Sequence, residues 1–323
     1  MKKNQLILII FFILLTISSN AQNYTFKTIQ PPDALTDTTF VYDINNRGEV
    51  VGSYERYYPD VIMSKKLGFY YDGKKYKTLD YPGATFSELV GLNNIHHFIG
   101  IYQKEGILHG YFYDNNNFQD IKHPDANNME LSAINDNDHI VGMYTDLNDQ
   151  TNSFYYDGTT FLPVRFPGAI LTIVQDINDK DEIVGYYQDE SYQFYGFIYK
   201  NNKYETLNYP GSEESILSGI NNIDKIFGNY KIEEEYHEFV YYRGKFVNFD
   251  YPGAIYVELT GINDQGQISG IWINEINTQS TFVATPIKLI GDVNIDGWVD
   301  LIDVMDLLKG ISNLDANQQF IQK

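Results

Sequence analysis

The 323-residue chain contains no cysteine. A disulfide framework is therefore excluded, and stability has to come mainly from burial of apolar side chains. Basic residues are also scarce, with 23 Lys and Arg against 43 Asp and Glu, which gives a formal net charge of −20 at pH 7. Such an excess of negative charge argues against nucleic acids and anionic membrane surfaces as partners.

Long apolar runs are absent except at the beginning of the chain. Lys2 and Lys3 precede an apolar run over residues 6–17, and small or polar residues lead from it to Ala21. This pattern predicts a secretory signal over residues 1–21, cleaved after Ala21. The run is shorter than the ~20 residues that a bilayer requires, so we expect no membrane span in the mature chain. The predicted location is secreted, either extracellular or at the surface of a bacterial cell.

Familiar catalytic motifs are missing as well. The chain has no Gly-x-Ser-x-Gly elbow, no phosphate-binding loop and no zinc-ligand spacing. His109, His123, His139 and His237 lie at scattered repeat positions with no companion pattern. His96 and His97 are adjacent but stand where other copies of a repeat carry turn residues, which favours a solvated turn over a metal site.

What the chain does have is one phrase repeated six times, as in "LVGLNNIHHFIGIY" and "LSAINDNDHIVGMY". The Asn that closes the first half of each phrase recurs at steps of 48, 42, 43, 43 and 42 residues. These residues are Asn45, Asn93, Asn135, Asn178, Asn221 and Asn263. A fixed period of this size, built from strand patterns, predicts a β-propeller with one four-stranded blade per repeat.

The third copy illustrates the blade. "MELSAIN" alternates apolar and polar residues, "HIVGMY" and "SFYY" follow as the second and third strands, and "TFLPVRF" is the fourth. Asp138 occupies the first turn, where residues that tolerate a left-handed backbone are expected, and Asp157-Gly158 is a two-residue hairpin signal. A Pro-Gly pair or a relative of it ends most copies and predicts a type II turn into the next blade.

The two ends of the repeat region predict closure of a ring. The sixth copy lacks a fourth strand, whereas residues 24–29 form a fourth strand without the preceding three. Pairing them gives an all-β fold, a six-bladed propeller of four-stranded blades over residues 22–287, with no open edge between first and last blade. An open solenoid is the alternative. The first copy carries six extra residues between its second and third strands, for which we expect a surface loop.

The repeats resemble the bacterial HAF-type extracellular repeat proteins. The resemblance rests on "Pro-Gly-Ala", on "Gly-Ile-Asn-Asn-x-Gly-x-Ile-Val-Gly" and on "Gly-Phe-x-Tyr", and it extends from about Tyr24 to Pro286. It implies an exported propeller-like array and no recognised catalytic set.

Residues 288–323 differ in character and contain a calcium-loop pattern. Acidic or amide side chains stand at loop positions 1, 3, 5, 9 and 12, with Gly297 at position 6 and a backbone carbonyl offered at position 7. The predicted metal ligands are Asp292, Asn294, Asp296, Trp298 through its carbonyl, Asp300 and Asp303. Val304, Leu307, Leu308 and Ile311 follow at helical spacing and predict a short helix with one apolar face.

This segment resembles a dockerin, a small calcium-binding domain that attaches secreted proteins to a cohesin partner. The resemblance implies calcium as the cofactor and a cohesin-like partner read by Leu301 and Ile302. It also implies a partial dockerin, because the second loop, which starts at Asp315, has Gln319 and Phe320 at its fifth and sixth positions.

Two functions are compatible with these patterns. The favoured hypothesis is a secreted, non-catalytic binding or scaffold-attached protein that associates with extracellular polysaccharide or protein complexes, with a glycan or protein ligand on one propeller face. The alternative is a polysaccharide-degrading hydrolase or lyase with paired carboxylates in the central funnel. A purely structural surface protein is a third possibility. The acids beside the innermost strands are Asp43, Glu88, Glu130, Asp176 and Glu258.

Overall fold

The structure of the protein is a computed structural model. It describes residues 24–35, 37–287, 303–305 and 307–308. Phe26–Ala284 form one compact unit, and the residues before and after it belong to a second. The signal segment predicted over residues 1–21 lies outside the described residues, as do the predicted calcium ligands other than Asp303.

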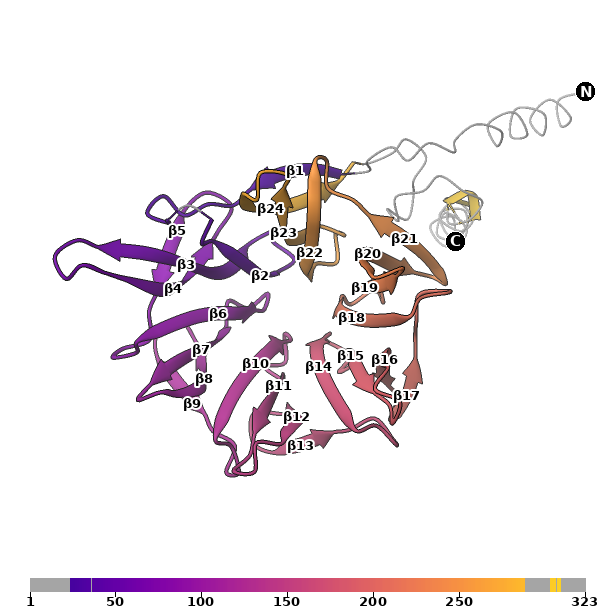
Figure 1. Cartoon of the computed structure of the whole chain (residues 1–323), viewed down its shortest axis with the longest axis horizontal. Coiled ribbons are helices and arrows are strands. Elements are labelled where there is room, and N and C mark those ends of the chain that lie inside the picture. Colours follow the sequence, from indigo (N-terminus) through magenta and orange to yellow (C-terminus); the bar gives the residue numbers. More distant parts are fainter. Residues whose placement is uncertain (1–23, 36, 288–302, 306, 309–323) are drawn as a thin grey trace, which may run out of the picture. The chain divides into compact units, whose positions relative to one another are not determined.

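The larger unit is built from four-stranded antiparallel sheets that follow one another around a ring, each forming a blade (Figure 1). Blade 1 consists of β2 (Phe40–Ile44), β3 (Val50–Tyr58), β4 (Met63–Tyr71) and β5 (Tyr76–Leu79). Blade 2 consists of β6 (Phe86–Leu92), β7 (Phe98–Lys104), β8 (Ile107–Tyr113) and β9 (Phe118–Ile121). Blade 3 consists of β10 (Asn128–Ile134), β11 (Ile140–Thr145), β12 (Thr151–Tyr156) and β13 (Phe161–Val164).

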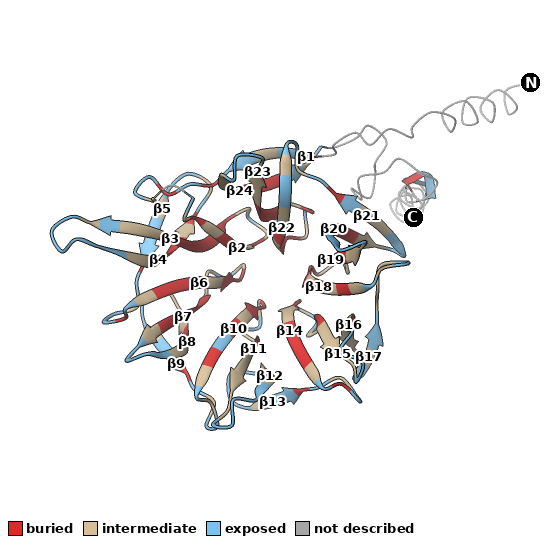
Figure 2. Cartoon of the chain, viewed as in Figure 1, coloured by how far each residue is buried: buried red, intermediate tan, exposed pale blue. Residues whose placement is uncertain are grey.

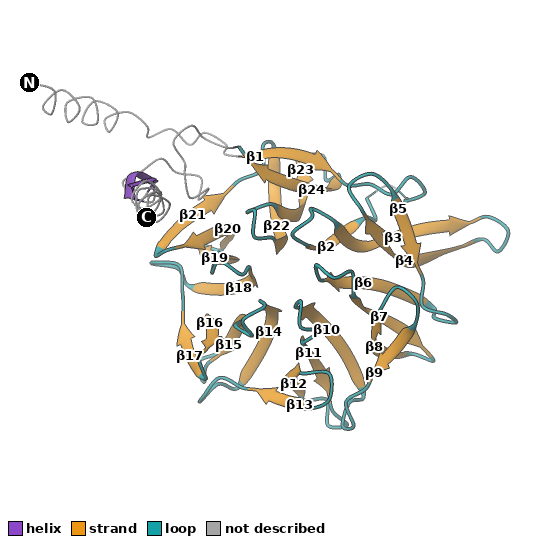
Figure 3. Cartoon of the chain, turned by 180° about the vertical axis from the view of Figure 1, so that it is seen from behind, coloured by secondary structure: helices purple, strands orange, loops and turns teal. Residues whose placement is uncertain are grey.

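The remaining blades repeat the same meander, with the first strand of each innermost (Figure 3). Blade 4 consists of β14 (Leu171–Ile177), β15 (Ile183–Gln188), β16 (Phe194–Lys200) and β17 (Lys203–Thr206). Blade 5 consists of β18 (Glu214–Ile220), β19 (Ile226–Ile232), β20 (Glu235–Tyr242) and β21 (Lys245–Phe249). Blade 6 consists of β22 (Ala254–Ile262), β23 (Ile268–Asn274), β24 (Gln279–Pro286) and β1 (Tyr24–Thr28).

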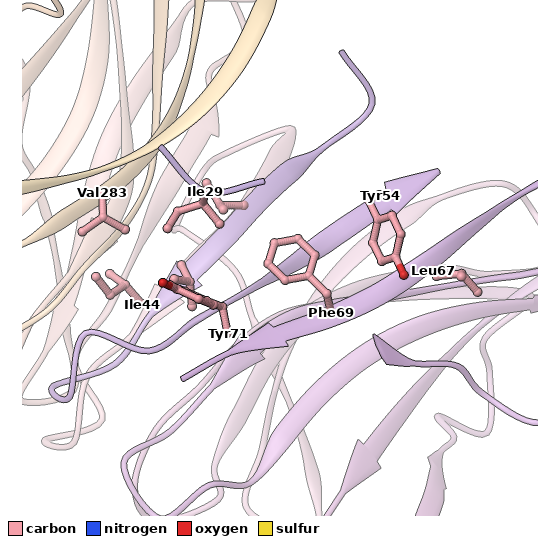
Figure 4. Close-up of a cluster of buried hydrophobic side chains, with 9 residues drawn as sticks. Ile29, Ile44, Tyr54, Leu67, Phe69, Tyr71 and Val283 are labelled. Atoms are coloured by element: carbon pink, nitrogen blue, oxygen red, sulfur yellow. The ribbon is translucent and has the colours of Figure 1, made fainter. Parts of the chain in front are cut away.

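The composition of blade 6 confirms the predicted closure, because its strand order is β1-β24-β23-β22. The Ile29 amide donates to the Thr281 carbonyl at 3.2 Å, immediately beyond β1. Ile29 and Val283 also share a buried cluster with Ile44 and Phe69 of blade 1 (Figure 4). The first and last segments of the repeat region are therefore joined, which excludes the open solenoid.

The core lies between successive blades, where the inner strands are most buried (Figure 2). One aromatic ring on the third or equivalent strand of each blade is essentially inaccessible to solvent. These rings are Phe69, Tyr111, Phe154, Phe197, Phe239 and Phe282. The repeated glycine of the second strand makes room for such a ring: a Cβ on Gly100 would lie 2.3 Å from Cζ of Tyr111 and 2.2 Å from the Glu88 carbonyl oxygen.

The turns follow the sequence prediction. All six residues at the first turn position have positive φ, between 58° and 73°. They are Gly48, His96, Asp138, Asp181, Asp224 and Gly266. Left-handed backbone favours Gly, Asn and Asp, so the repeat conserves the conformation of the turn through residues that tolerate it.

The insertion in the first copy does not form the expected loop. It lengthens β3 and β4 into a two-stranded ribbon paired as far as Tyr58 and Met63, and Figure 1 shows it projecting beyond the neighbouring blades. Tyr57 and Tyr58 favour extended backbone and continue β3, so that the turn falls at residues 59–62. At the tip, Ile62 is 81% exposed and has a φ of 51°.

In the second unit, residues 303–305 and 307–308 are helical, in agreement with a short helix after the predicted calcium loop. Asp303 is buried, whereas Val304, Leu307 and Leu308 are exposed. Among the described residues, no helix has the length and apolar character needed to cross a membrane.

Candidate functional site

The repeated asparagines meet at the ring axis and form a closed circle of hydrogen bonds. The Nδ2 group of each donates to the backbone carbonyl of its counterpart in the next blade at 2.9–3.4 Å, and Asn263 returns to Asn45. Each Oδ1 accepts amides of its own turn, as Asn135 does from Asn137 and His139. We call these six residues the inner Asn ring. All are buried, so their role is to join the blades.

The next residue of each copy forms a second circle. Each backbone amide donates to the side-chain Oδ1 of the following blade at 2.7–2.8 Å. The members are Asn46, Asn94, Asp136, Asp179, Asn222 and Asp264. Burial raises the pKa of Asp179, and the nearby Asp136 charge raises it further. The hydrogen bond from the Asp136 amide opposes this shift. The two circles make this end of the axis a rigid, polar constriction.

Two of the predicted acids, Asp43 and Asp176, line a polar cavity of about 60 Å³ at the axis. They occupy the same repeat position in blades 1 and 4, which are opposite in a six-membered ring. Each carboxylate accepts two backbone amides, one of its own strand and one of the next blade: Asp43 from Ile44 at 2.7 Å and Leu92 at 3.0 Å. The cavity is large enough for a few water molecules.

Asp176 repeats this arrangement, with Ile177 at 2.7 Å and Ile220 at 2.8 Å. Burial raises the pKa of Asp43 to about 6, against the opposing effect of its two backbone hydrogen bonds. Burial and then the Asp43 charge raise the pKa of Asp176 well above its usual range. One oxygen of each carboxylate accepts the amide of the following residue, and the other accepts an amide of the next blade. These acids are therefore placed as structural clamps between blades.

Glu88, Glu130 and Glu258 lie on the innermost strands at a different level, five residues before the inner Asn ring. Glu88 accepts a hydrogen bond from the Tyr42 hydroxyl at 2.6 Å and pairs with Lys66 Nζ at 2.9 Å. Burial, then the Glu88 charge, raises the pKa of Glu130. Burial followed by the charges of Glu88 and Glu258 raises the pKa of Tyr42. The structure thus brings these acids into one electrostatic group.

Sequence reasoning missed Glu238, which joins this group from the third strand of blade 5. It is 9% exposed. Burial, and then the Glu258 charge, raises its pKa well above the usual range, against a hydrogen bond from the Leu259 amide. The other copies carry Gly, Ser or Thr at this position, so an unmatched Glu in an otherwise small-residue column was the signal that could have found it.

His139 does have a companion, contrary to the expectation from the sequence: His97 occupies the same repeat position and has an equivalent partner. His97 and His139 each follow a ring asparagine by four residues, and each bonds through Nδ1 to an aspartate of the next blade, Asp138 at 2.8 Å and Asp181 at 2.7 Å. The pattern was hidden because its partners are 41 and 42 residues apart in the chain. His96 occupies the predicted turn and reaches Glu49 at 3.0 Å.

Of the predicted calcium ligands, Asp303 belongs to the described residues and the others lie outside them. Leu301 and Ile302 also lie outside them. Within the described ranges, no group of three or more His, Asp or Glu side chains is arranged to hold a metal ion.

No protein-family model matches the chain, and no curated protein sequence matches it. Solved structures do match. AofleA from Arthrobotrys oligospora has a TM-score of 0.53 and 14% identity, over 82% of this chain and 88% of that one. The β-propeller domain of the Trilobed protease from Pyrococcus furiosus, which has an open velcro topology, has a TM-score of 0.52 and 8% identity, over 83% and 100%.

The fucose-specific lectin from Aleuria aurantia is a third match, with a TM-score of 0.48 and 11% identity over 83% of this chain and 100% of that one. At these identities, the matches with a TM-score above 0.5 show the fold alone. Together with the sheet order, they establish the chain as a six-bladed β-propeller. The sheet order by itself shows that the first strand completes the last blade.

Proposed function

We propose that this protein is an exported, non-catalytic binding protein whose propeller is a rigid platform for a glycan or protein ligand. The observation that carries the proposal is the state of the two aspartates on the axis. In both Asp43 and Asp176, one carboxylate oxygen accepts the amide of the following residue and the other accepts an amide of the next blade. Acids fixed in this way stabilise the ring and are poorly placed to exchange protons with a substrate.

Export is supported by the basic and apolar start of the chain and by the small residues up to Ala21. The resemblance of the repeats to HAF-type extracellular proteins supports the same location. Amino-terminal sequencing of the secreted protein tests this point. A mature chain that begins at Gln22 is expected, and a chain that retains Met1 would contradict export by a cleaved signal.

Retention without turnover is the test of the binding function. Purified protein is run through native gels that contain single polysaccharides, and the same polysaccharides are assayed in solution for released reducing ends. We expect slower migration in at least one gel and no release above the buffer control. Release that disappears in a carboxylate-to-amide variant would show an enzyme.

One observation favours an enzyme as the second candidate. Glu238 and Glu258 are neighbouring carboxylates, and each has a raised pKa, caused first by burial. Glycoside cleavage uses a pair of carboxyl groups, of which the general acid has a raised pKa. If this candidate is correct, E258Q and E238Q each abolish sugar release, while D43N, on the axis, leaves it unchanged apart from any loss of folded protein.

The tail completes the proposal as a calcium-dependent attachment segment. Asp292, Asn294, Asp296, Asp300 and Asp303 supply side-chain oxygens at the spacing of a calcium loop. Leu301 and Ile302 occupy the positions that would contact and recognise a cohesin-like partner. Calorimetric titration of the full chain with calcium should show one site, lost in D296A. Equal heats for the two proteins would remove calcium from the proposal.

A further inference from the structure

Two tyrosines at the boundary of blades 5 and 6 have exposed rings. Tyr236, in β20, is 55% exposed, and Tyr256, in β22, is 46% exposed. Most tyrosines of the propeller are used differently: Tyr209 and Tyr230, for example, stack on each other with centroids 3.6 Å apart. Exposed aromatic rings that the fold does not use for packing mark a recognition surface.

Both rings are nevertheless held in position by their hydroxyl groups. Tyr236 donates to Glu214 Oε2 at 3.2 Å, and Tyr256 donates to Glu258 Oε2 at 3.3 Å. Lys231 lies over the Tyr236 ring, with Nζ 6.0 Å from the centroid. A ring with a fixed tilt loses little conformational entropy when a ligand stacks on it.

The two tyrosines lie on strands that meet at the blade boundary, and Glu238 of blade 5 approaches Glu258 of blade 6 across it. Glu238 follows Tyr236 by two residues on β20, so their side chains share a face of that strand. Burial, followed by the charges of Glu258 and Glu238, raises the pKa of Tyr256 to about 12. Strands β20 and β22 are also in contact.

The chemistry of this surface combines flat apolar rings with hydrogen-bond acceptors. Sugar rings present C–H faces that pack on aromatic rings and hydroxyl groups that donate to carboxylates. Glu214, Glu238 and Glu258, on a chain with a net charge of −20, repel anionic polymers such as uronic-acid polysaccharides and anionic lipid.

We propose that Tyr236 and Tyr256, with Glu214 and Glu258, form a binding subsite for a neutral or amino-bearing sugar ring at the boundary of blades 5 and 6. This subsite deepens the proposed function and rests on it. The rings provide stacking faces, and the carboxylates select hydroxyl or ammonium groups over carboxylates and sulfates.

The test uses affinity electrophoresis and calorimetry with four probes: a soluble neutral β-glucan, a galactomannan, chitosan oligosaccharides and polygalacturonate. We expect binding of at least one of the first three and none of polygalacturonate. Y236A and Y256A should each weaken binding roughly tenfold, the loss typical of a central aromatic contact. Y236F and Y256F keep the ring and should stay within about threefold of the wild type.

Tyr57 supplies the matched control, since it is 47% exposed but lies on the ribbon of blade 1. Y57A should bind every probe as the wild type does. Circular dichroism and the urea midpoint of each variant establish that the ring is intact. Preference for polygalacturonate, equal effects of Y57A and Y256A, or binding of poly-L-lysine but of no sugar would overturn the subsite.

The outcomes also separate the subsite from the proposed function. Retention on a polysaccharide that Y236A and Y256A leave untouched keeps the binding function and refutes this location. Sugar release that both alanine variants slow through a higher KM, with kcat unchanged, refutes the non-catalytic function and keeps the subsite. Failure to bind any of the four probes refutes the subsite.

Discussion

The buried aspartates predict a protein that gains stability as the pH falls from 7 to 5. In the folded state the pKa of Asp43 is about 6, against a usual value of 3.8. A raised pKa in the folded state means that ionisation disfavours folding, so the penalty is present above pH 6 and is relieved as protons bind between pH 6 and pH 4. At ~1.4 kcal/mol per pKa unit, it amounts to about 3 kcal/mol at pH 7, of which about 1 kcal/mol is relieved by pH 5.

Asp176 contributes in the same direction, because its pKa is raised first by burial and then by the Asp43 charge. Groups whose pKa is lowered in the folded state act against it, among them His123 and Glu49. Burial lowers the pKa of His123, because the charged imidazole is disfavoured in the folded state. The folded state therefore loses stability relative to the unfolded chain as the pH falls below 6.5. Burial alone would raise the pKa of Glu49, but hydrogen bonds from Asn45 and Tyr70 outweigh it, and the stability they give is lost only as the pH falls through 4.5 and below.

The assay is urea unfolding at pH 7, 6 and 5 and constant ionic strength, on the wild type and on D43N. The contributions of His123 and Glu49 are common to both proteins, so the difference between the two slopes isolates Asp43 and its effect on Asp176. We expect the wild type to gain about 1 kcal/mol more than D43N between pH 7 and pH 5. Equal slopes would refute the assignment of raised pKa values to the axis.

Three further predictions concern the ring. N135D places a carboxylate oxygen against the Asn178 carbonyl, where the amide now donates at 2.9 Å; we expect a loss of about 3 kcal/mol or more in urea unfolding, and a midpoint within error of the wild type would contradict the role of the circle. G100A brings a Cβ to 2.2 Å from the Glu88 carbonyl oxygen and should destabilise by more than about 2 kcal/mol, which differential scanning fluorimetry can measure. Deletion of residues 22–29 should expose the outer edge of β24 and cause self-association in size-exclusion chromatography, whereas a monomeric, stable product would contradict closure through β1.

Much of the fold was predictable because each repeat carries its own local signals. The turn residues with positive φ, such as Asp138 and Gly266, and the incomplete sixth copy together give blade count and closure. The ribbon of blade 1 was not predicted. A length change in a repeat gives the place of an insertion, but pairing between Tyr58 and Met63 depends on cross-strand contacts that a single sequence does not display.

The candidate site was predictable only in part. Asp43, Glu88 and Glu258 were identified from their places beside the inner strands, but Tyr236 and Glu238 were not. Both lie on the third strand of blade 5. Tyr236 bonds to Glu214 of its own blade, whereas Glu238 approaches Glu258 and Tyr256 of blade 6, so that proximity depends on how the blades pack. The hydrogen bonds from His97 and His139 to aspartates of the following blade could not be predicted from the alignment of the repeats either.

The seam between β1 and β24 sets the order in which the molecule can be finished. Ile29 and Thr281, which meet there, are 252 residues apart. Strand β1 therefore cannot pair until β24 has been synthesised. For a polypeptide that is exported, as proposed here, this delay is useful. The propeller cannot close before export as long as its last blade has not been synthesised.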